Sequence, residues 1–145
     1  MLKTLNRLAL ILGILLTAPA FAAESPRPPI GNQVIAYSGQ QGLKVWTLRV
    51  DERSANQALV QIGGIDHDWN MRIQKMAVEK TAKDVRYSTD VDGQPFVVLI
   101  LRGNHGELHL PGESQELPLG YDDALSQAGN PEHFLTDYLQ QSAAE

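Results

Sequence analysis

The sequence predicts an α+β domain, an antiparallel β-meander of six to seven strands with a C-terminal α-helix packed on it. Three observations favour this fold. From Val34 to Leu110 apolar and polar residues alternate with period two, as in strands. Turn residues interrupt this pattern at short intervals, and beyond residue 122 the apolar spacing becomes that of a helix. The sheet is expected to be curved or to form a partly open barrel.

The first 22 residues read as an export signal. Lys3 and Arg7 precede an apolar run, residues 8–16, and small side chains stand at Ala20 and Ala22. The run is shorter than the roughly 20 apolar residues that a membrane-spanning helix needs. We therefore expect cleavage after Ala22 and a periplasmic location.

The remaining 123 residues suit one domain. Residues 23–33 contain three prolines and a glycine, which predicts a flexible N-terminal segment. Residues 34–145 then form a single globular domain. The chain contains no cysteine, so disulfides, thiolate chemistry and lipid attachment through an N-terminal cysteine are excluded. We expect no membrane anchor after cleavage.

The charge of the processed chain disfavours some partners. Loss of Lys3 and Arg7 takes the formal net charge from −5 to −7. Nucleic acids and anionic membranes attract basic patches, so neither is an expected partner. A basic protein partner would suit this charge.

The first strands follow from simple alternation. Trp46, Leu48 and Val50 share one face of a strand over residues 43–50, and a second strand covers residues 58–62. Farther along, Met71 and Ile73 lie on one phase, whereas Met76 and Val78 lie on the other. An extra residue near 74–75 would restore the alternation, so we expect a β-bulge there.

The later strands are separated by glycine turns. Residues 85–89 alternate, and Asp92-Gly93 predicts a tight turn because glycine tolerates positive φ. The run 95–101 is apolar on both faces, which predicts a central strand covered on both sides. A turn over 103–106 and a short strand over 107–110 complete the pattern.

The C-terminal stretch predicts helices. Residues 122–127 suit one or two helical turns, and Asn130-Pro131 is a helix start, since Asn caps free N–H groups and Pro is tolerated at the first position. An apolar face that would close one side of the sheet is formed by Phe134, Leu135, Tyr138 and Leu139.

The candidate binding residues are Asp66, His67, Asp68 and Trp69, which fall between two predicted strands. Asp is an ordinary turn residue, and Trp is frequent at binding hot spots. We expect this loop to belong to a protein-contact surface. We predict no catalytic residue, no metal and no cofactor for this main hypothesis.

Two sets of residues keep a metal- or ligand-binding module open as an alternative. His67 could act with Asp66 and Asp68, because imidazole and carboxylate groups bind divalent ions. His105, Glu107 and His109 stand at alternate positions, and they would share a face if one strand held all three.

The sequence carries no common enzymatic signature. Neither a nucleophile elbow nor a phosphate-binding loop occurs. The leading hypothesis is a non-enzymatic binding domain of the inhibitor or immunity type, by analogy with other small, acidic, exported proteins. A second alternative is an envelope-directed hydrolase that uses carboxylates.

Overall fold

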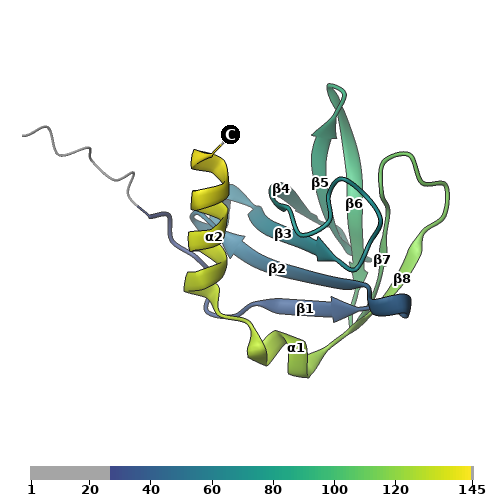
Figure 1. Cartoon of the computed structure of the whole chain (residues 1–145), viewed down its shortest axis with the longest axis horizontal. Helices are drawn as coiled ribbons and strands as arrows, with labels where there is room; N and C mark the ends of the chain where they lie inside the picture. Colours follow the sequence, from purple (N-terminus) through teal and green to yellow (C-terminus); the bar gives the residue numbers. More distant parts are fainter. Residues whose placement is uncertain (1–26, 145) are drawn as a thin grey trace, which may run out of the picture.

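The computed structural model describes residues 27–144, so the expected signal peptide and residues 23–26 lie outside the described residues. Eight strands form a closed barrel in which each strand pairs antiparallel with its neighbour in sequence, and β1 pairs with β8 (Figure 1). The strands are β1 (Ile35–Ser38), β2 (Lys44–Val50), β3 (Gln57–Gly63), β4 (Ile73–Lys80), β5 (Val85–Val91), β6 (Gln94–Arg102), β7 (His105–Leu108) and β8 (Leu117–Tyr121). Short 3₁₀ turns, η1 (Gln40–Gly42) and η2 (Arg53–Ala55), flank β2.

The predicted antiparallel meander with a C-terminal helix is confirmed, but the strand count is wrong and the barrel is closed. The structure has eight strands rather than six or seven, and most of the fold is β. The missed strand is β8, which contains Pro118 and Gly120, two residue types that are disfavoured inside strands. Closure depends on only two residue pairs, Tyr37 with Tyr121 and Ser38 with Gly120.

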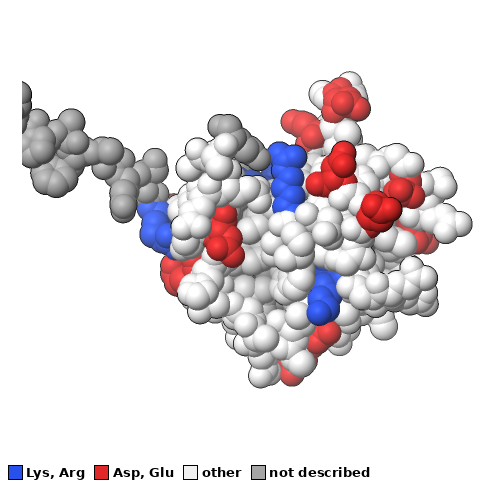
Figure 2. Space-filling model, viewed as in Figure 1, with Lys and Arg blue, Asp and Glu red and all other residues white. Residues whose placement is uncertain are grey.

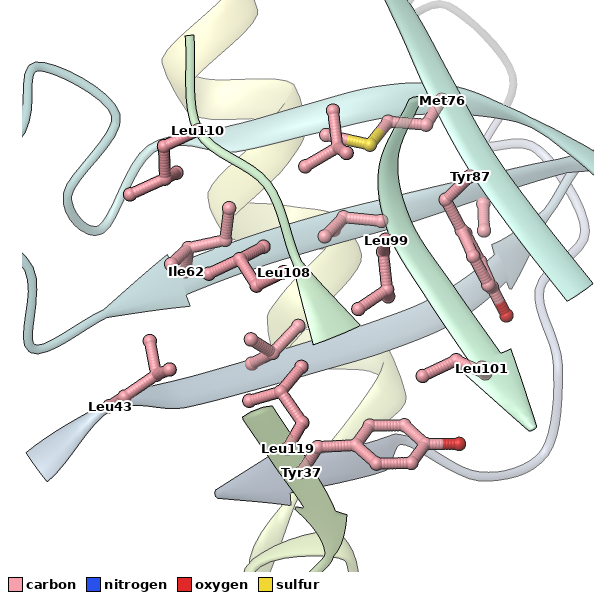
Figure 3. Close-up of a cluster of buried hydrophobic side chains, with 14 residues drawn as sticks. Tyr37, Leu43, Ile62, Met76, Tyr87, Leu99, Leu101, Leu108, Leu110 and Leu119 are labelled. Carbon is pink, nitrogen blue, oxygen red and sulfur yellow. The ribbon is translucent and has the colours of Figure 1, made fainter. Parts of the chain in front are cut away.

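The interior of the barrel is filled by apolar side chains (Figure 3). Leu99, Leu108 and Leu119 lie near one another in the space between the strands, with Tyr37 beside them. Leu99 and Leu108 have no exposed surface. We call this set the interior core; its buried members are Tyr37, Leu43, Val45, Ala58, Val60, Ile62, Met76, Tyr87, Val98, Leu99, Leu101, Leu108, Leu110 and Leu119.

A second core lies on the outside of the barrel, where helix α2 (Pro131–Ala143) covers part of its wall (Figure 1). We call it the outer core; its buried members are Val34, Leu48, Val50, Leu59, Ile73, Phe134 and Leu135. Trp46, Tyr138 and Leu139 pack against it. The predicted apolar face of the last helix therefore docks on the sheet as expected.

The β-bulge predicted near Gln74-Lys75 is wrong. Strands β3 and β4 keep one continuous register from Gln57 opposite Ala77 to Gln61 opposite Ile73. The apparent phase change arises because both faces of β4 are buried: Ile73 contributes to the outer core and Met76 to the interior core.

The register irregularity lies instead between β5 and β6. Tyr87 pairs with Leu99, but Ser88 pairs with Val97, so Val98 is the extra residue. This bulge lets consecutive residues Val98 and Leu99 both enter the interior core. The strand was expected to be covered on both faces, yet its apolar run reflects this bulge, and Ile100 is only half-buried.

The two helices begin as predicted. Helix α1 (Asp123–Ala128) is capped by the Asp122 carboxylate, which accepts a hydrogen bond from the Leu125 N–H. Asn130 caps α2 by accepting from the His133 N–H, and Pro131 follows at the first helical position. No helix among the described residues is both long and apolar enough to span a membrane.

The described part of the proline-containing segment, residues 27–33, makes contacts with the barrel. Ile30 forms an isolated bridge with Val50 and packs against the outer core. The Gly31 N–H donates to the Arg49 carbonyl over 2.9 Å. Arg27 forms an ion pair with Glu132 at the start of α2.

Candidate functional site

The loop that carries the four predicted binding residues, residues 64–72, is held by its own hydrogen bonds. Asn70 accepts a hydrogen bond from the Ile65 N–H through its side chain, and its own N–H donates to the His67 carbonyl. The Met71 N–H donates to the Ile62 carbonyl over 2.7 Å, which ties the loop to β3. The loop is thus a structured element at one end of the barrel.

His67 links this loop to the segment after β7. Its Nδ1 accepts a hydrogen bond from the Trp69 N–H, at 3.1 Å. The other ring nitrogen must then carry the proton, and Nε2 donates to the Pro111 carbonyl, at 3.0 Å. Both ring nitrogens are therefore occupied, and the contacts give His67 a structural role.

Trp69 is half-buried and packs against the interior core. Its ring meets His67 edge to face at 5.5 Å and Phe96 at 6.5 Å between ring centroids. The side chain anchors the loop to the barrel. Of the four predicted residues, Asp66 and Asp68 are exposed, whereas His67 and Trp69 are half-buried.

Asp66 opens onto a cavity of about 540 Å³ at this end of the barrel. We call it the mouth pocket; its lining residues come from three stretches of the chain and are Gln40, Gln41, Leu43, Gly64, Ile65, Asp66, Leu110, Glu113, Ser114, Gln115, Leu117 and Pro118. These segments lie at the right of Figure 1, away from α2. Pockets at barrel mouths are common binding sites.

The mouth pocket is acidic. Among residues 27–144, Asp66 and Glu113 are the only charged residues that line it, and the amide and hydroxyl side chains of the lining add further polar groups. On the face in Figure 2, acidic side chains gather mainly toward this end of the molecule. The lining would therefore favour a positively charged group.

Sequence reasoning found Asp66 but missed the opposite wall of the pocket. Pro111-Gly112 reads as the end of a strand, and residues 113–116 then read as loop. The barrel closes through β8 and brings Glu113 to the loop that contains Asp66. The polar residues 113–116, which stand between two apolar stretches, were the available sequence signal for this wall of the pocket.

The proposed metal set on β7 is only partly assembled. Glu107 and His109 lie close together on the outer side of the barrel, but the third member is Glu116 from the following loop rather than His105. His109 Nε2 lies 3.8 Å from Glu107 Oε1 and 3.9 Å from Glu116 Oε2. That nitrogen is buried and has no hydrogen-bond partner among the described residues. Asp66, His67 and Asp68 do not form such a group within the described part of the chain.

The two carboxyl groups of this cluster titrate differently. A hydrogen bond with Glu116 lowers the pKa of Glu107, and the nearby Arg102 guanidinium acts in the same direction. The hydrogen bond with Glu107 and the negative charge of Glu107 raise the pKa of Glu116. The pair therefore retains a proton more readily than two separate carboxylates, and a cation could take the place of that proton.

A comparison of the chain with protein-family models, curated proteins and solved structures finds no match.

Proposed function

We propose that the protein is an exported, non-enzymatic binding domain of the inhibitor or immunity type, which receives a basic segment of a partner protein in the mouth pocket. The observation that carries this proposal is the acidic pocket at the open end of a barrel whose interior is already occupied. The expected export signal would place the domain in the periplasm.

The filled interior favours recognition at the surface. Eight-stranded barrels are just wide enough to be packed with side chains or to hold one small ligand. In this barrel Leu99, Leu108 and Val45 have no exposed surface, and the rings of Tyr37 and Tyr87 occupy further space. A ligand carried within the barrel is therefore disfavoured, and the mouth, loops and outer wall are the surfaces available for binding.

The geometry of the mouth pocket favours a lysine or arginine side chain presented by a loop. Asp66 and Glu113 come from different loops that line the same cavity. A cation between them would gain charge-assisted hydrogen bonds, which are stronger than neutral ones. The volume of about 540 Å³ accommodates more than one side chain but not a folded element.

Affinity capture from a cell-envelope extract tests the proposal. The bait is the wild-type protein, and the test variant carries Asp66→Asn and Glu113→Gln, two exposed positions whose replacement should not disturb the fold. The control variant carries Asp90→Asn and Asp137→Asn, which remove the same charge from exposed sites outside the pocket. A specific partner should be retained by the wild-type and control proteins and lost by the test variant.

Trp69→Ala is less suitable because this side chain anchors the loop to the interior core. Equal capture by the wild-type protein and the Asp66→Asn, Glu113→Gln variant would reject the pocket as the contact site. Equal losses from both double variants would show that overall charge, rather than the pocket, determines binding.

A second candidate function, divalent-metal binding, is favoured by the cluster of Glu107, His109 and Glu116. Their ligand atoms all lie within 4.8 Å of one another. Ligands around a tetrahedral zinc ion stand about 3.3 Å apart, so small side-chain movements would suffice. One imidazole and two carboxylates suit zinc and similar transition ions, with a fourth position open.

Calorimetric titration of zinc tests this candidate. We expect one ion per chain, with binding abolished by His109→Gln. Binding should be unchanged by His105→Gln, since His105 is an exposed residue at the start of β7 and is absent from the cluster. Arg102→Gln should strengthen zinc binding, because Arg102 Nη2 lies 3.4 Å from Glu107 Oε1 and competes with a metal ion for that carboxylate. Stoichiometry far below one would reject the site.

A further inference from the structure

A second cavity lies at the opposite end of the barrel from the mouth pocket. Its volume is about 260 Å³, and it is surrounded by the end of β2, the end of β4 and the start of β5. We call it the basic pocket; it is lined by Gln33, Ile35, Thr47, Arg49, Arg53, Asn56, Ala58, Val78, Lys80, Val85 and Tyr87.

The charge of this lining is opposite to that of the mouth pocket. Arg49, Arg53 and Lys80 all border the cavity, and no acidic residue of the described part of the chain does. None of the three forms an ion pair with a carboxylate of the described residues. Three unpaired cations around one cavity are notable in a chain of net charge −5.

Arg49 is the central group of the pocket. It follows Val45 and Thr47 on the inward-facing side of β2 and stands opposite the small side chain of Ala58. Its Nη1 is buried and has no hydrogen-bond partner within residues 27–144. An unsatisfied buried guanidinium N–H is costly, and an anion in the adjoining cavity would satisfy it.

Among the described residues, acidic side chains border a neighbouring cavity rather than this one. Asp51 and Glu52 line a neighbouring cavity to which Arg49 and Arg53 also contribute. Asp51 is already paired with Lys75, at 2.6 Å. Arg86, on β5, is engaged by Asp84 at 3.1 Å.

The inner wall of the basic pocket is partly polar and partly apolar. Thr47, Ala58 and Tyr87 are buried and form its deep side. Burial raises the pKa of Tyr87, so its hydroxyl stays protonated at neutral pH. Ile35 is 44% exposed and offers apolar surface at the rim.

We propose that the basic pocket is a binding site for a small organic anion, a carboxylate or phosphate with a compact apolar body. Arg49 contacts the anionic head, Arg53 and Lys80 provide further positive charge, and the apolar body packs against the valines and Ile35. The site does not depend on the function proposed for the mouth pocket, because the two cavities share no lining residue.

Titrations of the isotope-labelled protein with benzoate, inorganic phosphate and neutral benzamide, followed by NMR, test the proposal. We expect benzoate or phosphate to shift the resonances of Ala58, Val78 and Val85, and benzamide to bind at least about tenfold more weakly than benzoate. Preference for benzoate over phosphate would identify a carboxylate ligand, and the reverse preference would identify a phosphate.

Variants of the lining residues distinguish binding in the pocket from nonspecific attraction of anions to positive charge. Arg49→Gln should weaken binding at least about tenfold. Because Arg49 is half-buried, the double variant Arg53→Gln, Lys80→Gln provides a second test at two exposed positions. Lys83→Gln, an exposed lysine outside the lining, is the control and should leave affinity unchanged. Shifts absent from the pocket, or equal affinities for benzoate and benzamide, would overturn the proposal.

Discussion

At the scale of single residues, Gly64 determines how closely two loops of the mouth pocket approach. It has a φ of +74°, and a Cβ at this position would collide with the Gly42 carbonyl oxygen. Gly64→Ala should therefore lower the free energy of unfolding by at least about 2 kcal/mol, from backbone strain and overpacking together. Urea denaturation measures this change.

Gly93→Ala is the matched control, since Gly93 has a φ of +78° but open space around it. Only backbone strain should contribute at that position, and it should lower the free energy of unfolding by about 1 kcal/mol. Equal losses at the two positions would show that the contact between Gly64 and Gly42 is unimportant.

Ionisation of Tyr37 should make the free energy of unfolding depend on pH in the alkaline range. Burial, followed by the nearby Tyr87 and Tyr121, raises the pKa of Tyr37 from 10.0 to about 12. The unfolded chain releases this proton near pH 10, whereas the folded chain holds it, so unfolding becomes more favourable as pH rises from about 10 to 12. The stabilisation is fully present below pH 10.

Absorbance at the tyrosinate band, recorded beside unfolding curves, measures both effects. In Tyr37→Phe the loss of stability over this pH range should be smaller. An unchanged pH dependence in that variant would assign the effect to another group.

At the scale of secondary-structure elements, Gln141 joins helix α2 to the barrel. Its side-chain amide accepts from the Ile73 N–H at 2.9 Å and donates to the Ile73 carbonyl at 2.7 Å, so it pairs with the first residue of β4 as a neighbouring strand would. Gln141→Ala should cost about 1–3 kcal/mol because both backbone groups are partly buried.

Gln140→Ala, an exposed neighbour on the same helix, is the control and should have little effect. Hydrogen exchange at the Ile73 amide should accelerate in Gln141→Ala only. Unchanged protection of that amide would mean that the side-chain pairing does not hold α2 in place.

The sequence could predict the elements whose determinants are local. Asn130-Pro131 and Asp92-Gly93 specify a helix start and a turn through neighbouring atoms alone, and both are confirmed. The bulge was misplaced because period-two reasoning assumes one buried face, whereas β4 is buried on both. Strand β8 was missed because pairing across the barrel, not local propensity, places Pro118 in a strand.

The candidate site was predictable only in part for the same reason. The Asp66 loop is visible in the sequence, but its proximity to Glu113 depends on which strands pair. The packing of His67 and Trp69 against the barrel was not predictable, because alternation does not reveal a ring that packs under a loop. Likewise, Glu116 rather than His105 joins Glu107 and His109, because the loop after β7 brings Glu116 beside them.

At the scale of the whole molecule, the barrel has a filled interior and two mouths of opposite charge. Leu108→Ala should therefore open a cavity within the packed interior and lower the free energy of unfolding by about 2–5 kcal/mol. Xenon NMR should detect a bound atom in this variant but not in the wild-type interior. Xenon binding inside the wild-type barrel would contradict the packed interior.

NMR titration of the labelled protein with a blocked Gly-Arg-Gly-Arg-Gly peptide is the most direct test of whether the acidic mouth recognises a basic segment. We predict shifts at Asp66, Glu113 and the adjoining lining residues, no shifts at Leu108 or along α2, and no response to the matched Gly-Gln-Gly-Gln-Gly peptide. Shifts confined to α2 or the barrel interior, or equal responses to both peptides, would contradict the claim.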